Sequence, residues 1–257
     1  MIRTDMRMVF RSKVFWATCA FMVVLLAIGS DDDIRHFLYG NPREGIWQEK
    51  FLLTAGYDDG LVPFYCPIVA VLPYVLSYRK ERDSGYRQLM VLKTSPNAYR
   101  WAKLLSVAAS GAGVMCLPFL CWMPVCIFLG TGRVRYPIMS HTIDPVLQPL
   151  FESHPNLFVF LYLVNASFAG AVFALLALGV SAVVRNRYLA LLAPFGFCLF
   201  TAAVLAVHIL YNLTAFILVI FGESWWMGLG GHICYLLLLL LFGVGLFIIG
   251  DCSAEKL

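Results

Sequence analysis

The chain has little charge and lacks the motifs that carry most soluble chemistry. Only 13% of its 257 residues are charged, whereas 61% are hydrophobic and the mean hydropathy is +0.79. A soluble domain of this size could not bury that much apolar surface. There is also no glycine-rich phosphate loop, no paired-cysteine zinc spacing and no basic stripe interleaved with aromatic residues. We therefore expect no nucleotide, nucleic acid, cofactor or metal ion on this chain, and no catalytic residues.

The eight cysteines do not form the pattern of a disulfide framework, because seven of them lie in or beside apolar stretches. Cys116, Cys121 and Cys126 are spaced by five residues, so on a helix they rotate around the axis instead of sharing a face. We interpret the cysteines as small buried hydrophobic residues.

Six apolar stretches are long enough to cross a hydrocarbon core of roughly 30 Å as helices, which satisfy their own backbone amides in lipid. The predicted spans are residues 14–30, 61–78, 101–129, 157–184, 188–211 and 232–249. A shorter apolar piece at 213–226 is predicted to be a re-entrant or interfacial element, with Trp225 and Trp226 in an aromatic belt. The sequence thus predicts an all-α polytopic membrane protein, with residues 1–257 forming one transmembrane domain.

The first thirteen residues predict an amphipathic helix on the membrane surface. Arg3, Arg7 and Arg11 recur every four residues and share one face among apolar neighbours. A secretory signal peptide is the alternative, but three aspartates and no small-residue cleavage site follow the apolar run that ends near Ser30.

The positive charges predict that both termini lie in the cytoplasm. Fourteen of the nineteen lysines and arginines fall on the side of the termini when six spans are threaded through a membrane. The first outer loop is acidic instead, and such a cluster could attract a cationic substrate or metal ion. A solvated acidic loop is the interpretation that we prefer. Its acidic residues are Asp31, Asp32, Asp33, Glu44, Glu49, Asp58 and Asp59.

The polar stretch 79–96 predicts a charged elbow between two membrane helices. Tyr86, Leu89, Met90 and Lys93 recur at three- and four-residue spacings, which is typical of a short amphipathic helix. Ser95 then suits an N-cap, and Pro96 suits the first position of a new helix leading into the next span. Such an elbow can contact a soluble partner.

This pattern resembles the permease subunits of ATP-binding-cassette exporters of the type-2 class, which include drug, antimicrobial-peptide and polysaccharide exporters. The shared residues are a glutamate, a glycine four positions later, a leucine four further, then a proline and a lysine. They correspond here to Glu81, Gly85, Leu89, Pro96 and Lys103.

The resemblance implies a coupling helix, roughly Arg82 to Lys93, that docks on a separate cytoplasmic ATPase subunit carrying ATP and Mg²⁺. Glu81 would pair with a basic residue of that subunit or with Arg79, Lys80 or Arg82 of the elbow itself. Gly85 would leave room for the docked partner. The ATPase-coupling residues implied are Glu81, Gly85, Tyr86, Leu89, Met90, Lys93 and Pro96.

Within the spans, small residues recur every four positions and permit close helix packing, either inside the chain or in a permease dimer. These stripes are Ala108 with Ala112, Ala109 with Gly113, and Ala166 with Gly170 and Ala174. Asn165 and His208 are the deepest polar residues and are candidates for a transport pathway, although an asparagine often only bonds a neighbouring helix.

The function expected from the resemblance is export of an amphipathic peptide, drug or lipid-like molecule across a prokaryotic cell membrane, with a second permease copy or paralogue. A secondary transporter or a membrane assembly subunit is the main alternative. Secondary transport is disfavoured because no Asp, Glu, Lys or Arg lies well inside a predicted span. An intramembrane serine protease using Ser110 and His208 is a poor match, since the surrounding motif is missing.

Overall fold

The computed structural model describes residues 2–40, 45–57, 61–73, 75–93, 95–132, 143–184, 186–205, 219–221 and 228–255. These residues form helices and short connections, and the described part of the chain contains no strand. The helices, in chain order, are α1 (Ile2–Arg11), α2 (Lys13–Gly29), α3 (Asp31–Leu38), α4 (Trp47–Leu52), η1 (Leu53–Tyr57), α5 (Leu61–Val69), α6 (Val75–Asp83), α7 (Tyr86–Lys93), α8 (Pro96–Leu129), α10 (Gln148–Ser153), α11 (Pro155–Val183), α12 (Arg187–Leu205) and α13 (Gly228–Glu255).

Among the described residues, three helices are long and apolar enough to cross a membrane, and they identify the chain as a membrane protein. They are α8, α11 and the stretch Leu229–Cys252 of α13. The helices α1 and α2 meet at a bend of 52°, and if they form one broken span the number rises to four. The predicted number of six is therefore not confirmed. The expected fifth span is described only as far as Leu205, in α12.

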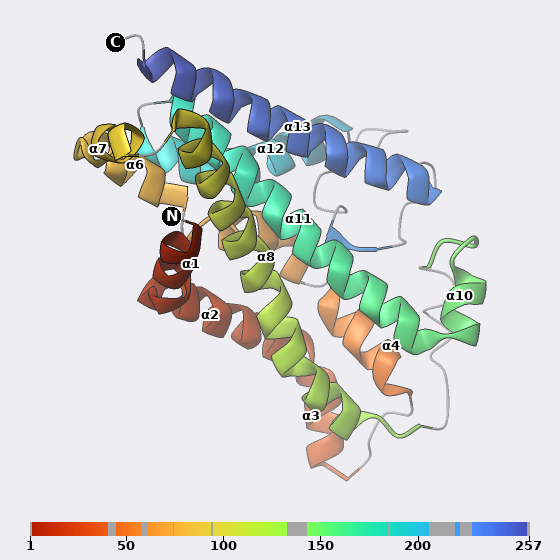
Figure 1. Ribbon diagram of the computed structural model, residues 1–257. Coiled ribbons are helices and arrows are strands. Elements are labelled where there is room, and N and C mark those ends of the chain that lie inside the picture. The colour runs from red at the N-terminus through yellow and green to blue at the C-terminus, as the bar shows by residue number, and fades with distance from the viewer. Residues whose placement is uncertain are drawn as a thin grey trace.

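The helix α11 is the centre of the bundle (Figure 1). It packs against α8 on one side and α13 on the other, while α2 lies on the far side of α8. Most of its side chains are buried, whereas α8 and α13 expose much of their apolar surface. In a membrane protein these exposed apolar faces are suited to lipid or to another membrane subunit.

Helix backbones nearly touch at the crossings of α8 with α11 and of α11 with α13. A Cβ atom added to Gly111 of α8 would lie 2.4 Å from the carbonyl oxygen of Gly170 in α11. A Cβ atom added to Gly179 of α11 would lie 2.4 Å from the carbonyl oxygen of Gly243 in α13. Glycine is required at such crossings because any side chain would displace the facing backbone.

The small-residue stripes contribute to packing within the chain. Ala166, Gly170 and Ala174 are buried along α11, and Ala174 faces Gly111 of α8. On α8, Gly113 lies against the ring of Phe15 in α2. Of the two uses left open by the sequence, the structure shows packing between helices of one chain for these residues.

The predicted span 61–78 is two short helices instead of one. The helix α5 ends at Val69, residues 70–73 form a turn, and α6 begins at Val75. Pro73 explains the break, because a proline ring clashes with the carbonyl group four residues earlier, which here belongs to Val69. A continuous helix through this stretch is therefore disfavoured.

The segment 45–57, predicted as part of an outer loop, is also helical and largely buried. It forms α4 and η1, and Phe51 packs its ring near Phe119 and Tyr162 with centroid separations of 5.8 and 6.1 Å. The sequence signal was the apolar run Phe51-Leu52-Leu53, which is too short to cross a membrane but long enough to enter a protein core.

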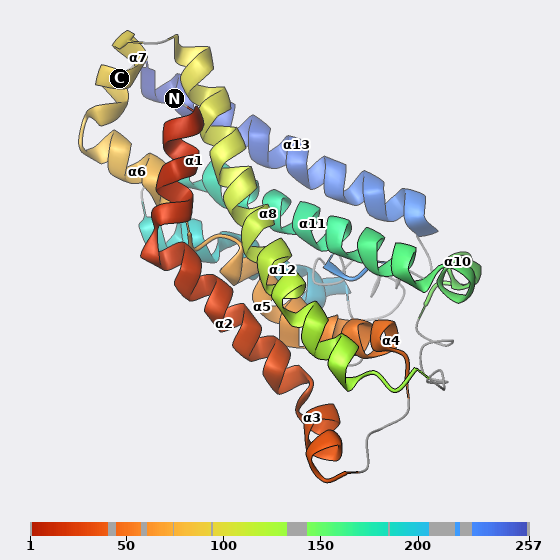
Figure 2. The same cartoon turned by 60° about the horizontal axis from the view of Figure 1, so that its bottom comes forward.

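The N-terminal helix packs along α8, and its predicted place on a membrane surface is not confirmed. Val9 and Asp5 are buried, whereas Arg7 and Arg11 are exposed. The side chain of Arg3 is outside the described part. Figures 1 and 2 show the start of α1, the end of α13 and the helices α6 and α7 gathered at one end of the bundle, with α3 at the other.

Candidate functional site

The candidate site is the elbow, which we define as α6, the turn at Ser84 and Gly85, and α7. The helix α6 ends at Asp83, and Gly85 has a φ angle of +71°. This left-handed conformation is common for glycine and strained for other residues, and it ends α6 and starts a new direction. No described atom lies within 4 Å of the position of a Cβ atom on Gly85. The conformation of the turn therefore explains this glycine within the chain, and the expected role of Gly85 in leaving room for a docked partner stays a prediction.

The helix α7 begins at Tyr86, whereas the coupling helix was expected to begin near Arg82, because Arg82 and Asp83 belong to α6 and the turn at Ser84 and Gly85 follows them. Met90 packs against the hydrophobic core, whereas Tyr86, Leu89 and Lys93 are exposed. Leu92 is 83% exposed. The residues of the predicted amphipathic face therefore have two different environments. Met90 packs α7 against the bundle, whereas the other three side chains are exposed.

The start of α8 also matches the prediction. Ser95 has an extended backbone, and its side chain accepts a hydrogen bond from the backbone N–H of Ala98 at 3.2 Å. Pro96 occupies the first turn of the helix. The serine satisfies one of the N–H groups that a helix leaves unpaired at its beginning, and the proline has no N–H to satisfy.

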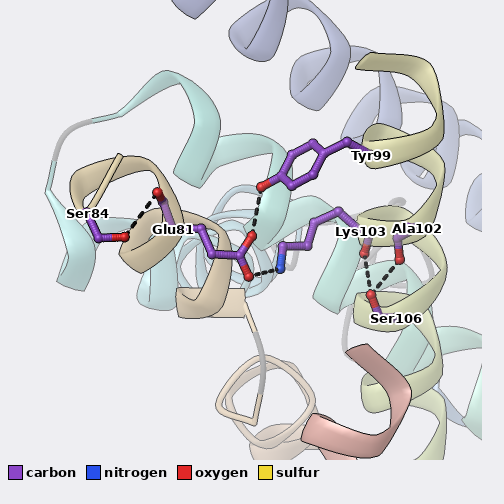
Figure 3. Close-up of polar contacts among 6 residues, drawn as sticks. All are labelled: Glu81, Ser84, Tyr99, Ala102, Lys103 and Ser106. Atoms are coloured by element: carbon purple, nitrogen blue, oxygen red, sulfur yellow. Dashed lines mark hydrogen bonds and ion pairs between the residues drawn. The ribbon is translucent and has the colours of Figure 1, made fainter. Parts of the chain in front are cut away.

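Glu81 of α6 binds two residues of α8 (Figure 3). Its Oε1 atom lies 2.6 Å from the Nζ atom of Lys103, and its Oε2 atom accepts a hydrogen bond from the hydroxyl group of Tyr99 at 2.8 Å. Tyr99 and Lys103 are four residues apart and therefore lie on the same face of α8. Both are fully buried. The contact joins the elbow to the long membrane helix.

Within the chain, Glu81 pairs with Lys103 and Tyr99 and not with Lys80 or Arg82. The side chain of Arg79 lies outside the described part, and the expected pairing with a basic residue of another subunit stays a prediction. Lys103 was in the family pattern without a role, and the structure brings it together with the glutamate of the same pattern. Arg82 instead donates a hydrogen bond from Nη1 to the carbonyl oxygen of Ala182, at the end of α11, at 3.0 Å. A basic side chain at this place satisfies a carbonyl group that the helix leaves free.

A second ionic contact lies at the same end of the bundle and was not found from the sequence. The Oδ2 atom of Asp251 in α13 lies 2.8 Å from the Nε atom of Arg100 in α8. Its Oδ1 atom accepts a hydrogen bond from the hydroxyl group of Tyr78 in α6 at 2.9 Å. Asp251 follows a long uncharged stretch and resembles an ordinary charged residue after a span. Only the packing of three helices reveals its partners.

Of the two candidate pathway residues, Asn165 is described and His208 is outside the described part. The amide group of Asn165 donates a hydrogen bond to the carbonyl oxygen of Val219 at 3.2 Å. Its Oδ1 atom lies 2.9 Å from the Nε2 atom of His232 in α13. Asn165 therefore bonds neighbouring segments, which is the simpler of the two interpretations. His232 was not a candidate in the sequence.

The acidic cluster at the opposite end is partly paired and helical. Asp31 forms an ion pair with Arg35 at 2.6 Å, and Asp33 lies 3.6 Å from the ammonium group of the buried Lys50. The Oε2 atom of Glu49 accepts a hydrogen bond from the backbone N–H of Ile46. The described residues contain no group of three His, Cys, Asp or Glu side chains suited to a metal ion. The interpretation as a solvated loop is wrong for Glu49, which is buried.

The cysteines are all free in the described part of the chain. Cys19, Cys66, Cys126 and Cys198 are buried, as expected, whereas Cys121 and Cys234 are exposed on helices.

Comparison with known proteins gave no match to this chain, whether against family models, curated proteins or solved structures. The assignment of a function therefore depends on the elbow and its contacts.

Proposed function

We propose that this chain is the membrane subunit of an ATP-driven exporter and works with a separate ATPase of the ATP-binding-cassette type. The observation that carries the proposal is the elbow: its helix α7 exposes Tyr86, Leu89 and Leu92, while Glu81 of α6 is bound to α8. The sequence contains no phosphate-binding loop, so the energy would come from a partner.

The contacts of the elbow suggest how movement of the ATPase would reach the membrane helices. Displacement of α7 would be passed to α6 through the turn at Gly85, and then to α8 through Glu81 and Lys103. The backbones of α8 and α11 touch at Gly111 and Gly170, so a shift of α8 would move α11 as well. Contiguous packed contacts of this kind are the physical route of coupling between distant sites.

The remaining parts of the proposal follow from the exposed membrane surface and the charge distribution. The helices α12 and α13 expose apolar residues along their length, among them Phe200 and Phe242. These faces would contact lipid or a second permease subunit.

The excess of lysine and arginine near the elbow and the termini supports a cytoplasmic position for the elbow and for both termini, in a prokaryotic cell membrane. An amphipathic peptide, drug or lipid-like molecule is the proposed substrate class.

Replacement of one exposed leucine tests the docking surface. The chain would be co-expressed in turn with each ATP-binding-cassette ATPase encoded in the same genome and purified in detergent. A charge at Leu92 should weaken association about tenfold or more, because it would be buried without a partner in the complex. The matched control is Leu38→Glu, since Leu38 is 75% exposed on α3 at the opposite end. Equal recovery of the ATPase with Leu92→Glu and Leu38→Glu would contradict the proposal.

The same preparations test where ATP is hydrolysed. The chain without its partner should neither bind nor hydrolyse ATP, whereas the complex in lipid nanodiscs should hydrolyse it. Hydrolysis by the isolated chain would mean that the ATP-hydrolysing site lies on this chain and not on a partner. Failure of the native chain to bind the ATPase would contradict the proposal as a whole.

Ion-coupled secondary transport is a second candidate, favoured by one observation. Lys50 is buried beside Asp33 at the end of the bundle opposite the elbow, and buried ionisable groups are typical of ion-coupled carriers. Proteoliposomes that contain only this chain would accumulate a fluorescent cationic dye under an imposed proton gradient if this candidate is right. ATP-dependent accumulation that also requires the ATPase would favour the exporter.

A further inference from the structure

A buried carboxylate joins the last helix to the elbow. Asp251 is 1% exposed and is the first charged residue of α13 after its uncharged membrane stretch. One of its oxygen atoms binds Arg100 of α8 and the other binds Tyr78 of α6. The ring of Tyr78 also packs on Phe247, one turn earlier in α13, with 5.1 Å between ring centroids. Tyr78 of α6 therefore makes both a polar and an apolar contact with α13.

The helix α6 makes two such contacts from one face. Tyr78 and Glu81 are three residues apart, so their side chains lie near each other on the helix surface. Tyr78 reaches α13 through Asp251, and Glu81 reaches α8 through Lys103. Arg100, which completes the contact of Asp251, is three residues before Lys103 on α8. Each carboxylate thus binds one tyrosine and one cation, and the two sets together join three helices.

The contact of α13 with α11 lies directly beside this network. A Cβ atom added to Gly250 would lie 2.8 Å from the Cβ atom of Ala182. The carbonyl group of Ala182 also accepts the hydrogen bond from Arg82 of the elbow. The end of α13 therefore lies between the elbow and the end of α11 and contacts both.

We propose that Asp251 is a positioning residue that makes the end of α13 move with the elbow. This inference rests on the proposed function, in which the elbow receives the movement of the ATPase. The carboxylate of Asp251 holds Arg100 of α8 and Tyr78 of α6 at once, so that the elbow, the start of α8 and the end of α13 form one body. Movement of the ATPase then reaches both outer helices, α8 and α13, that pack on the central α11.

Distance measurements between spin labels test this inference in the complex with the ATPase. The eight native cysteines would be replaced by serine, and cysteines would be introduced at exposed positions. The pair Leu92 and Val164 reports on the elbow relative to α11, and the pair Ile249 and Val164 reports on the end of α13. In the parent protein, Mg–ATP should shift both distances. With Asp251→Leu, only the distance from Leu92 should still shift.

Control variants separate coupling from stability. Asp31→Leu removes a carboxylate at the opposite end and should leave both shifts unchanged. The exchange of Arg100→Asp with Asp251→Arg retains an ion pair and should restore at least half of the shift at Ile249. If Asp251→Leu does not fold, Tyr78→Phe removes one hydroxyl group, keeps the ring and should reduce the shift at Ile249 alone.

The outcomes distinguish this inference from the proposed function. Suppose that the parent binds the ATPase and that the distance between labels at Ile249 and Val164 still shifts in Asp251→Leu. Asp251 is then not a positioning residue, while the proposed function stands. If the leucine variant does not fold, the same conclusion follows from a persisting shift in Tyr78→Phe. If the parent binds no ATPase, both fall together. Loss of the shifts at both Leu92 and Ile249 in a folded Asp251→Leu complex would also overturn the inference, because Asp251 would then be needed for the elbow itself.

Discussion

The elbow end of the molecule and the helix crossings are held together by opposite kinds of contact. At the elbow, the mostly buried Glu81 and the fully buried Asp251 bind cations and tyrosine hydroxyl groups from other helices. At the crossings of α8, α11 and α13, glycines bring backbones together with no side chain between them. Charged contacts depend on both partners being present, whereas glycine crossings depend on the absence of a side chain where the backbones meet. The two regions should therefore respond to mutation in different ways.

The largest effect is expected when one partner of the buried pair is removed. Lys103→Ala leaves the carboxylate of Glu81 without its cation, and Glu81→Ala leaves a buried ammonium group. Each should lower the free energy of unfolding by up to about 3 to 5 kcal/mol, because a buried or mostly buried charge loses its opposite charge. Thermal unfolding in a fixed detergent measures the loss.

The double variant sharpens this prediction. Replacing Glu81 and Lys103 together by Gln and Met removes both charges, so its cost should be well below the sum of the two single costs. Strict additivity of the single and double variants would show that the two residues do not interact in the folded protein.

A smaller loss is expected at a glycine crossing. Gly179→Ala places a methyl group 2.4 Å from the carbonyl oxygen of Gly243, and the backbones must separate. Forcing an extra carbon into a packed contact typically costs about 1 to 3 kcal/mol. Gly245→Ala is the matched control in α13, since no described atom lies within 4 Å of its added Cβ atom. It should be neutral or stabilising by up to about 1 kcal/mol, because alanine favours helix more than glycine does. Equal melting temperatures for the two variants would contradict the crossing.

The turn of the elbow should show an effect of backbone conformation alone. Gly85→Val requires a β-branched residue at a φ angle of +71°, which should cost about 1 to 2 kcal/mol. Asparagine tolerates this conformation, so Gly85→Asn should recover most of the loss. The measurement is again thermal unfolding, together with recovery of the ATPase. A valine variant as stable as the parent would mean that the turn adopts another conformation.

The sequence predicted what depends on local pattern. A short helix ending at Lys93, the cap at Ser95 and the three long apolar helices α8, α11 and α13 follow from spacing and composition, and the structure has them. The buried α4 was missed, because its apolar run is short and its neighbours Glu49 and Lys50 are charged. The partners that Glu81 has within the chain were missed for a related reason. Charged residues close in sequence were considered first, while the fold places Lys103 beside Glu81 across two helices. Contacts between distant segments depend on packing, which periodicity does not encode.

The smallest effect is expected at the surface pair of α3, which provides the contrast for the buried ones. Arg35 lies 2.6 Å from Asp31, but the two side chains are 66% and 50% exposed. Water and salt screen such a pair, so Arg35→Ala should cost about 0 to 1 kcal/mol, and less in 1 M salt. Asp31→Ala should cost slightly more than Arg35→Ala, because Asp31 also lies in the first turn of α3, where a negative charge is favoured by the helix dipole. Melting temperatures at low and high salt measure both effects. If Arg35→Ala destabilises the protein as much as Lys103→Ala, then burial is not what makes the elbow pair strong, and the contrast between the two ends fails.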